Sequence, residues 1–187
     1  MKIIKKSKII ITGVGGQGIV FLTEIIVEAA MRARINVATS EIHGLSQRGG
    51  TVTAGITLGE GTYGMVEEGG ADFLLGLEML EAQRCVNYLN KKSVAVIDNT
   101  CIFPYSVNAG SVPYPDTKLF LSYLKKNISD VLFIDDVFNE TEPVMRNLVV
   151  LSKAVSHSKF PIKKSFFIEA IANNSRGDKN KMLKIFQ

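Results

Sequence analysis

The sequence predicts a three-layer α/β fold, in which helices cover both faces of a mainly parallel sheet. Short β-branched segments bounded by glycine alternate along the chain with amphipathic segments of helical period. Of the 16 glycines, fourteen lie between Gly13 and Gly76, so loops with demanding backbone geometry are concentrated in the first half. The 187 residues suit one domain. We therefore expect a single domain that spans residues 1–187.

The first half begins with a buried strand at residues 8–12, a glycine loop, and a helix from residue 19 whose apolar face includes Leu22, Ile26 and Ala29. A second strand at 36–40 would complete a βαβ unit with a right-handed crossover. Residues 51–58 alternate between apolar and polar side chains, which predicts a strand with one face less buried. A strand at 72–76 follows.

In the second half, residues 78–90 have the apolar spacing of a helix and residues 94–98 that of a buried parallel strand. A short helix at 117–126 and a strand at 131–135 come next. Thr141 can cap a helix that carries Pro143 in its first turn and runs to about residue 155. A helix near 163–174 would close the domain. The alternation of strands and helices gives the three layers.

Composition and charge exclude several classes of protein. The chain is 46% apolar and has 22 basic against 18 acidic side chains, which argues against disorder. The lysines are scattered in pairs, so we expect no nucleic-acid partner. Two cysteines are too few for an iron–sulfur cluster, and the two histidines lack metal spacing, so we expect no metal in this chain. No apolar run approaches the ~20 residues of a membrane helix, and no signal-peptide core is present, which predicts a cytoplasmic protein without a membrane partner.

The segment Gly13-Val14-Gly15-Gly16-Gln17-Gly18 satisfies the dinucleotide-binding fingerprint, because it follows a predicted strand and opens a predicted helix. In a Rossmann-like sheet such a loop lets a phosphate approach backbone amides at a helix N-terminus. Glu41, 23 residues beyond Gly18, lies where a ribose-binding carboxylate would be. This pattern favours NAD. The alternative is a tight turn that uses glycine for packing only, and the local pattern leaves both open.

A second loop, residues 41–50, combines charged and polar side chains with three glycines, as functional loops do. Because the ends of the first and second strands of an open sheet face one crevice, we expect the two glycine-rich loops to be neighbours. Arg48 can bind a carboxylate or a phosphate in bidentate fashion, and a surface salt bridge is the alternative.

These two loops together resemble a known family. The glycine loop, followed by Ser40-Glu41-Ile42-His43-Gly44-Leu45-Ser46-Gln47-Arg48-Gly49-Gly50, is similar to the gamma subunit of 2-oxoacid:ferredoxin oxidoreductases. The form of the second loop is similar to the small subunit of the indolepyruvate branch. The block Ala71–Glu78 resembles the next family motif, a strand that leads into the helix carrying Glu81. The resemblance covers most of the chain and fades after about Lys159.

The resemblance implies a subunit of an oxidoreductase that decarboxylates a 2-oxo acid on thiamine diphosphate, such as indolepyruvate or another aryl or branched acid. It implies an acyl-CoA product and electron transfer to ferredoxin, which the chain meets through the holoenzyme. Thiamine diphosphate, magnesium and the iron–sulfur clusters would lie on large partner chains, since this sequence lacks their motifs. We therefore expect no catalytic residue here and no activity of the chain alone.

Two roles then remain for the loops. We favour an interface with the thiamine-binding subunit. The other role is a wall of the coenzyme A site, for which the candidate residues are Gly13, Gly15, Gly16, Gln17, Gly18, Glu41, Arg48 and Gly49. A protein of a different class, a stand-alone NAD- or CoA-binding Rossmann-like protein, is the alternative.

Overall fold

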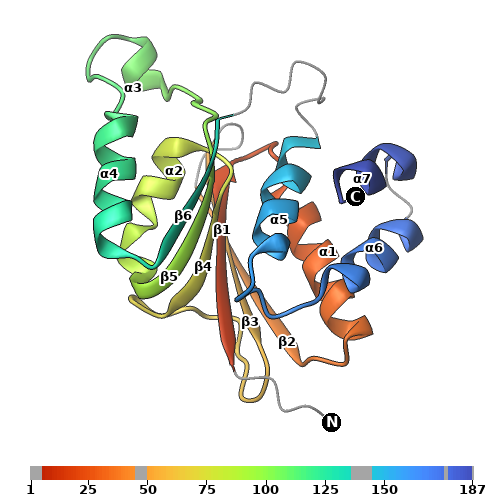
Figure 1. Cartoon of the computed structure of the whole chain (residues 1–187). Coiled ribbons are helices and arrows are strands. Elements are labelled where there is room, and N and C mark those ends of the chain that lie inside the picture. The colour runs from red at the N-terminus through yellow and green to blue at the C-terminus, as the bar shows by residue number, and fades with distance from the viewer. Residues whose placement is uncertain (1–5, 45–49, 136–144, 175–176, 187) are drawn as a thin grey trace.

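The computed structural model describes residues 6–44, 50–135, 145–174 and 177–186. Its centre is a six-stranded sheet of order β2-β3-β1-β4-β5-β6 (Figure 1). The strands are β1 (Ser7–Val14), β2 (Val37–His43), β3 (Thr51–Leu58), β4 (Ala71–Gly76), β5 (Leu89–Asp98) and β6 (Asp130–Ile134). Strands β1, β4, β5 and β6 are parallel, whereas β3 is antiparallel to both of its neighbours.

Helices cover both faces of the sheet, which confirms the predicted three-layer α/β fold (Figure 1). One face carries α1 (Ile19–Arg32), α5 (Arg146–Ser156) and α6 (Lys164–Asn173), with α7 (Lys179–Ile185) beyond them. The other face carries α2 (Met79–Arg84) and α4 (Thr117–Asn127), together with the 3₁₀ turn η1 (Val86–Tyr88) and the short α3 (Tyr105–Asn108). None of the helices in the described ranges is long and apolar enough to cross a membrane.

Strand β3 separates the two strands of the expected βαβ unit, because it pairs with both β1 and β2. The physical reason is the connection between β2 and β3. Only residues 44–50 join these strands, which is too short for the crossover that parallel neighbours need and long enough for a hairpin. Strands β1 and β2 therefore run in the same direction without touching.

The second half differs from the prediction in four places. The expected helix at 78–90 ends at Arg84, and β5 begins at Leu89 rather than at residue 94. Ser93 explains this early start, because its hydroxyl accepts from the Asn90 amide at 2.8 Å and donates to the Ala71 carbonyl at 2.6 Å. The short α3 and the terminal α7 were not predicted. The predicted capping residues Thr141 and Pro143 lie outside the described residues, and the described helix α5 begins at Arg146.

The prediction that β3 has one less buried face is wrong for the second half of that strand. Gly55 and Thr57 are buried, because the connection from β3 to β4 folds back over them. The Gly64 amide donates to Thr57 Oγ1 at 3.1 Å, and Ser40 Oγ donates to the Gly64 carbonyl at 2.8 Å. Residues 59–70 thus cover β2 and β3 on the face of the sheet that α2 and α4 cover elsewhere.

Candidate functional site

The glycine loop lies at the carboxyl edge of the sheet, which is the edge where β1, β4, β5 and β6 end. Gly13 belongs to the end of β1, and Gly18 is the N-cap of α1, as predicted. The Gly15 amide donates to the Gly50 carbonyl at 2.9 Å. This hydrogen bond places the end of the second glycine-rich loop beside the first, so the loops meet there as expected.

Gln17 folds back over Gly13 and ties the glycine loop to the neighbouring strand. Its Oε1 accepts from the Val14 amide at 2.7 Å, and its Nε2 donates to the Leu77 carbonyl, just beyond β4, at 2.8 Å. A Cβ atom at position 13 would lie 2.6 Å from Gln17 Oε1, which is closer than van der Waals contact allows. Glycine at position 13 therefore makes room for a side chain of the protein itself.

Asn147, near the start of α5, occupies the space beside Gly18 that a Cβ atom would need. It is buried, and its Nδ2 donates to the Gln17 carbonyl at 3.0 Å. Gly18 has φ of 79°, and a Cβ atom there would lie 2.3 Å from Asn147 Nδ2. Asn147 was not among the predicted site residues. Its signal was a polar residue directly before the apolar run Leu148–Leu151.

The loop therefore uses two of its fingerprint glycines for internal packing, and the Gly15 amide is already bonded within the protein. What the loop exposes is its tip, where Gly15 and Gly16 are both solvent-accessible. Gly16 has φ of 101° and no neighbouring atom within 4 Å of a would-be Cβ. The tip of the loop is therefore open to solvent, whereas Gly13 and Gly18 are packed within the protein.

Glu41 does not lie beside the glycine loop. It is exposed on β2 opposite Ala54 of β3, so a whole strand stands between it and β1. Two strand spacings amount to about 10 Å. In a fold that binds a dinucleotide, the acidic residue follows the strand next to β1, and β3 occupies that position here. Arg48 and Gly49 lie outside the described residues, as does the side chain of His43.

Glu78 organises the edge beyond β4. It is fully buried and caps α2, where its Oε2 accepts from the Glu81 amide at 2.8 Å. Its Oε1 accepts from the Ile102 amide at 3.0 Å and from the Tyr114 hydroxyl. Burial, and next the hydrogen bond to Glu78, raise the pKa of Tyr114, so this phenol stays protonated and donates. The whole group holds the β5–α4 connection against α2.

The end of β5 is fixed in a similar way from the opposite face of the sheet. Asp98 is buried and forms an ion pair with Arg146 at the start of α5. Arg146 Nε donates to Asp98 Oδ2 at 2.9 Å. The Thr100 hydroxyl donates to the same carboxylate. Neighbouring Asn99 donates from Nδ2 to Asp135 Oδ1 at 3.0 Å, which joins β5 to the residue that follows β6. The strand ends are thus bonded to one another.

A smaller polar group lies under the start of β3. Glu81 and Cys85 project from α2 and its end, and both are buried. Burial raises the pKa of Glu81, while a hydrogen bond from Thr51 and the charge of Arg84 oppose that shift. Glu81 Oε2 has no hydrogen-bond partner among the described residues. Burial also raises the pKa of the Cys85 thiol, which keeps it protonated and unreactive. In the described ranges, no group of three His, Cys, Asp or Glu side chains could hold a metal ion.

The fold is shared with several solved structures. The chain is similar to the gamma subunit of a keto/oxoacid ferredoxin oxidoreductase from Geobacter sulfurreducens, with a TM-score of 0.64 and 19% identity over 96% of this chain and 91% of that one. It is also similar to part of the 2-oxoglutarate:ferredoxin oxidoreductase from Magnetococcus marinus, with a TM-score of 0.66 and 16% identity over 97% of this chain and 30% of that longer one.

The sequence itself defines the family. The model of the family described as pyruvate ferredoxin/flavodoxin oxidoreductase matches residues 8–185, so the chain belongs to that family and is part of an oxidoreductase. It is 35% identical to indolepyruvate oxidoreductase subunit IorB of Archaeoglobus fulgidus over 169 residues, which are 89% of this chain and 84% of that protein. These findings confirm the resemblance that the two loops carry, and they favour it over a stand-alone nucleotide-binding protein. The match to residue 185 shows that the expected fading after about Lys159 was wrong.

Proposed function

We propose that this chain is the small subunit of an indolepyruvate-type 2-oxoacid:ferredoxin oxidoreductase in the cytoplasm, built as one domain over residues 1–187. The holoenzyme decarboxylates an aryl 2-oxo acid oxidatively, forms an acyl-CoA and passes electrons to ferredoxin. Thiamine diphosphate, its magnesium ion and the iron–sulfur clusters are held by large partner subunits. The likeness to the IorB subunit supports the substrate class.

One observation supports the proposal that this chain holds a partner's active site while its partners perform the chemistry. The carboxyl edge, where α/β folds place their ligands, is filled by the chain's own side chains: Gln17 over Gly13, Asn147 against Gly18, and Glu78 under the β5–α4 connection. These hydrogen bonds fix the described part of this edge within the chain itself. They support a role in which the chain shapes and holds a partner's active site rather than performing chemistry.

Exposed apolar side chains beside this edge support a partner-facing role. Tyr105 is 87% exposed and Phe103 is 51% exposed, and both lie in the β5–α4 connection, where Ile102 and Val112 are exposed as well. Figure 1 shows α3 at the same end of the molecule as the carboxyl ends of the strands. Large apolar groups gathered in this way are typical of protein interfaces. We propose that the carboxyl edge, including the tip Gly15–Gly16, faces the large subunit.

The first experiment is isolation of the complex. The tagged chain is recovered from its own anaerobically lysed cells, and viologen reduction is measured with a panel of 2-oxo acids and coenzyme A. We expect a brown complex with a large thiamine-containing subunit and highest activity with an aryl 2-oxo acid. A colourless chain without a partner would contradict the proposal, and a preference for pyruvate would contradict the proposed substrate class.

A pair of tyrosine variants tests whether the carboxyl edge contacts the large subunit. A charge placed in the interface by Tyr105→Asp should reduce recovery of the large subunit strongly. Tyr63→Asp, at a side chain 74% exposed in the β3–β4 connection, is the matched control, and we expect it to leave recovery unchanged. The reverse result would move the interface to the segment that contains the exposed side chains of Tyr63 and Met65.

Arg48→Ala tests the coenzyme A role of the two loops. Because an arginine that contacts a phosphate contributes a charge-assisted hydrogen bond, its loss would raise the KM for coenzyme A at least about tenfold. We expect the assembled complex to keep its KM, since the interface role is favoured. A raised KM with normal assembly would instead assign coenzyme A contact to residues 41–50 and the adjoining glycine loop.

A further inference from the structure

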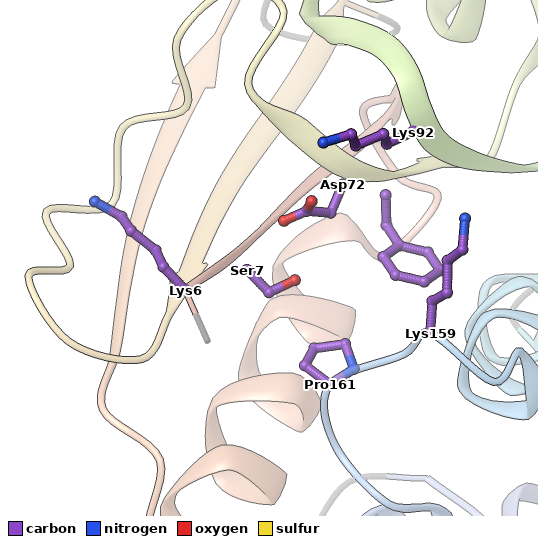
Figure 2. A pocket seen from close by; sticks show the side chains of 7 residues that line it. Lys6, Ser7, Asp72, Lys92, Lys159 and Pro161 are labelled. Carbon is purple, nitrogen blue, oxygen red and sulfur yellow. The ribbon is translucent and has the colours of Figure 1, made fainter. Parts of the chain in front are cut away.

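A pocket opens at the amino edge of the sheet, which is opposite to the edge described above. Its volume is about 380 Å³, and it lies among the starts of β1, β4 and β5 and the connection between α5 and α6 (Figure 2). The charged and polar side chains that line it are Lys6, Ser7, Asp72, Lys92 and Lys159. Phe73 and Pro161 provide its apolar wall. Such a volume is within the range of small-molecule sites.

The lining carries an excess of positive charge. The ammonium groups of Lys92 and Lys159, from two separate segments, stand against one carboxylate, Asp72. In the described part of the chain, none of these lysines has a carboxylate oxygen within 4 Å. Lys159 Nζ donates to Ser129 Oγ at 2.7 Å, a neutral partner, and Lys92 is exposed at the rim. The ammonium groups of Lys92 and Lys159 are therefore available to an anion.

The remaining groups have fixed positions. Lys6 lines the pocket with its aliphatic stem, while its ammonium donates to the Gly61 carbonyl at 2.9 Å and lies 4.5 Å from the Tyr63 ring centre. Asp72 accepts from the Lys8 amide through Oδ2 at 2.9 Å. Figure 2 shows this carboxylate between Lys92 and Ser7. Phe73 is held below by edge contacts with His157 and Phe160, so the apolar wall does not depend on a ligand.

We infer that this pocket binds a small phosphorylated molecule that also carries hydroxyl groups. Lys92 and Lys159 contact its phosphate groups as point charges, and Asp72 accepts from its hydroxyl groups. A concave site of this size fits a small molecule better than a peptide, which needs a longer groove or a sheet edge. The pocket and the proposed partner-facing edge lie at opposite ends of the strands. The inference therefore goes beyond the proposed function and does not rest on it.

The test uses the full chain and two probes, inorganic pyrophosphate and ADP, in calorimetric titrations at low salt. We expect both to bind at a single site. The double variant Lys92→Ala/Lys159→Ala should weaken both at least about tenfold, because it removes two charge-assisted contacts. Lys125→Ala/Lys126→Ala removes two exposed lysines from the last turn of α4 and is the matched control. Its affinities should stay within about twofold, since screened surface charges contribute little.

Asp72→Asn separates a ligand site from a merely basic surface. Asparagine keeps an acceptor for the Lys8 amide and loses the negative charge, so pyrophosphate should bind several-fold more tightly. ADP should gain less than pyrophosphate, because its hydroxyls lose a charged acceptor. The inference fails if neither probe binds at millimolar concentration, or if both pairs of lysine variants weaken binding equally. It also fails if a hexaglutamate peptide binds through Lys92 and Lys159 and displaces both probes.

Discussion

The two edges of the sheet differ in what fills them. At the carboxyl edge, Gln17, Asn147 and Glu78 bond to backbone groups of neighbouring elements, and the ends of the strands are joined to one another. At the amino edge, the side chains of Lys92 and Lys159 surround a pocket of about 380 Å³. Open α/β sheets bind ligands at the carboxyl edge. In the described part of this chain the carboxyl edge is occupied by the protein's own side chains, and the lysine-lined pocket lies at the other end.

This difference shows that a glycine fingerprint specifies backbone geometry and leaves the occupant undetermined. The same glycine spacing that admits a diphosphate elsewhere admits Gln17 and Asn147 here, since both need a close approach to a residue without a Cβ atom. Substitutions at the two edges should therefore have unequal effects. Substitutions at the carboxyl edge should lower the free energy of unfolding. Substitutions at the amino edge should lower only the affinity for a ligand.

The largest effect is expected for Gly18→Ala. The new Cβ would meet Asn147 Nδ2 at 2.3 Å, and alanine is strained at φ of 79°. Backbone strain and overpacking together predict a loss of about 3 kcal/mol in the free energy of unfolding, measured by chemical denaturation.

Gly110→Ala is the matched control for this substitution. Its φ is 71°, and no atom lies within 4 Å of the new Cβ, so it measures backbone strain alone at about 1 kcal/mol. The added variant Asn147→Ala should recover the overpacking part in the Gly18→Ala background. Equal losses at positions 18 and 110 would contradict the close packing of Asn147 against the loop.

A smaller effect is expected for Tyr114→Phe. The hydroxyl donates to the buried Glu78 carboxylate and accepts from the Leu80 amide at 3.1 Å. A hydrogen bond to a charged group contributes about 1.5–3 kcal/mol, so we expect a loss of about 2 kcal/mol. Tyr123→Phe, with a half-exposed ring on α4, should change stability by less than about 0.5 kcal/mol. A similar result for both variants would mean that the Glu78 group does not stabilise this edge.

Glu81→Gln should change how stability depends on pH. Burial raises the pKa of Glu81 in the folded protein, so the folded state binds the proton more tightly than the unfolded state does. The contribution of this group is present at pH 4 and is lost as pH rises through the folded pKa.

At pH 8 the glutamine variant should therefore be more stable than the parent, and the difference should shrink as the pH falls toward 4. Denaturation at pH 4, 6 and 8 measures the difference. Glu60→Gln, in the exposed turn after β3, serves as the control and should follow the parent at each pH. A constant difference across the three pH values would show that Glu81 is not the titrating group.

The smallest effect on stability is expected at the amino edge. Lys92→Ala and Lys159→Ala remove exposed side chains, so the free energy of unfolding should change by less than about 0.5 kcal/mol in each. Thermal unfolding without ligand measures this. A loss comparable to that of Tyr114→Phe would mean that the lysines hold the fold together, and the contrast between the edges would disappear.

Much of the fold could be predicted because most strands are marked by local patterns. The predicted strand at 51–58 has the same bounds as β3, and the predicted helix at 117–126 ends one residue before α4 does. The order of the strands was harder. The strand–helix–strand pattern predicted a βαβ unit of β1, α1 and β2, although the short connection at 44–50 indicates a hairpin between β2 and β3.

The site was less predictable, since it depends on contacts between distant parts of the chain. The Gly13–Gly18 loop was found from its spacing, but its use of Asn147 joins residues 129 positions apart in sequence. No local pattern encodes such a contact. Glu78 was part of the quoted family block, yet its role became visible only when Ile102 and Tyr114 were seen to donate to it. The lysine pocket is likewise assembled from three separate segments.

The central position of β1 has a consequence for how the chain folds. This strand comes first in the sequence, yet it lies between β3, to which it pairs antiparallel, and β4, to which it pairs in parallel. The hairpin of β2 and β3 and the parallel group β4–β6 have no other strand to join them. Residues 7–14 therefore connect the two parts of the sheet. We expect the emerging chain to stay without a continuous sheet until both sets of later strands have been synthesised and have closed around its beginning.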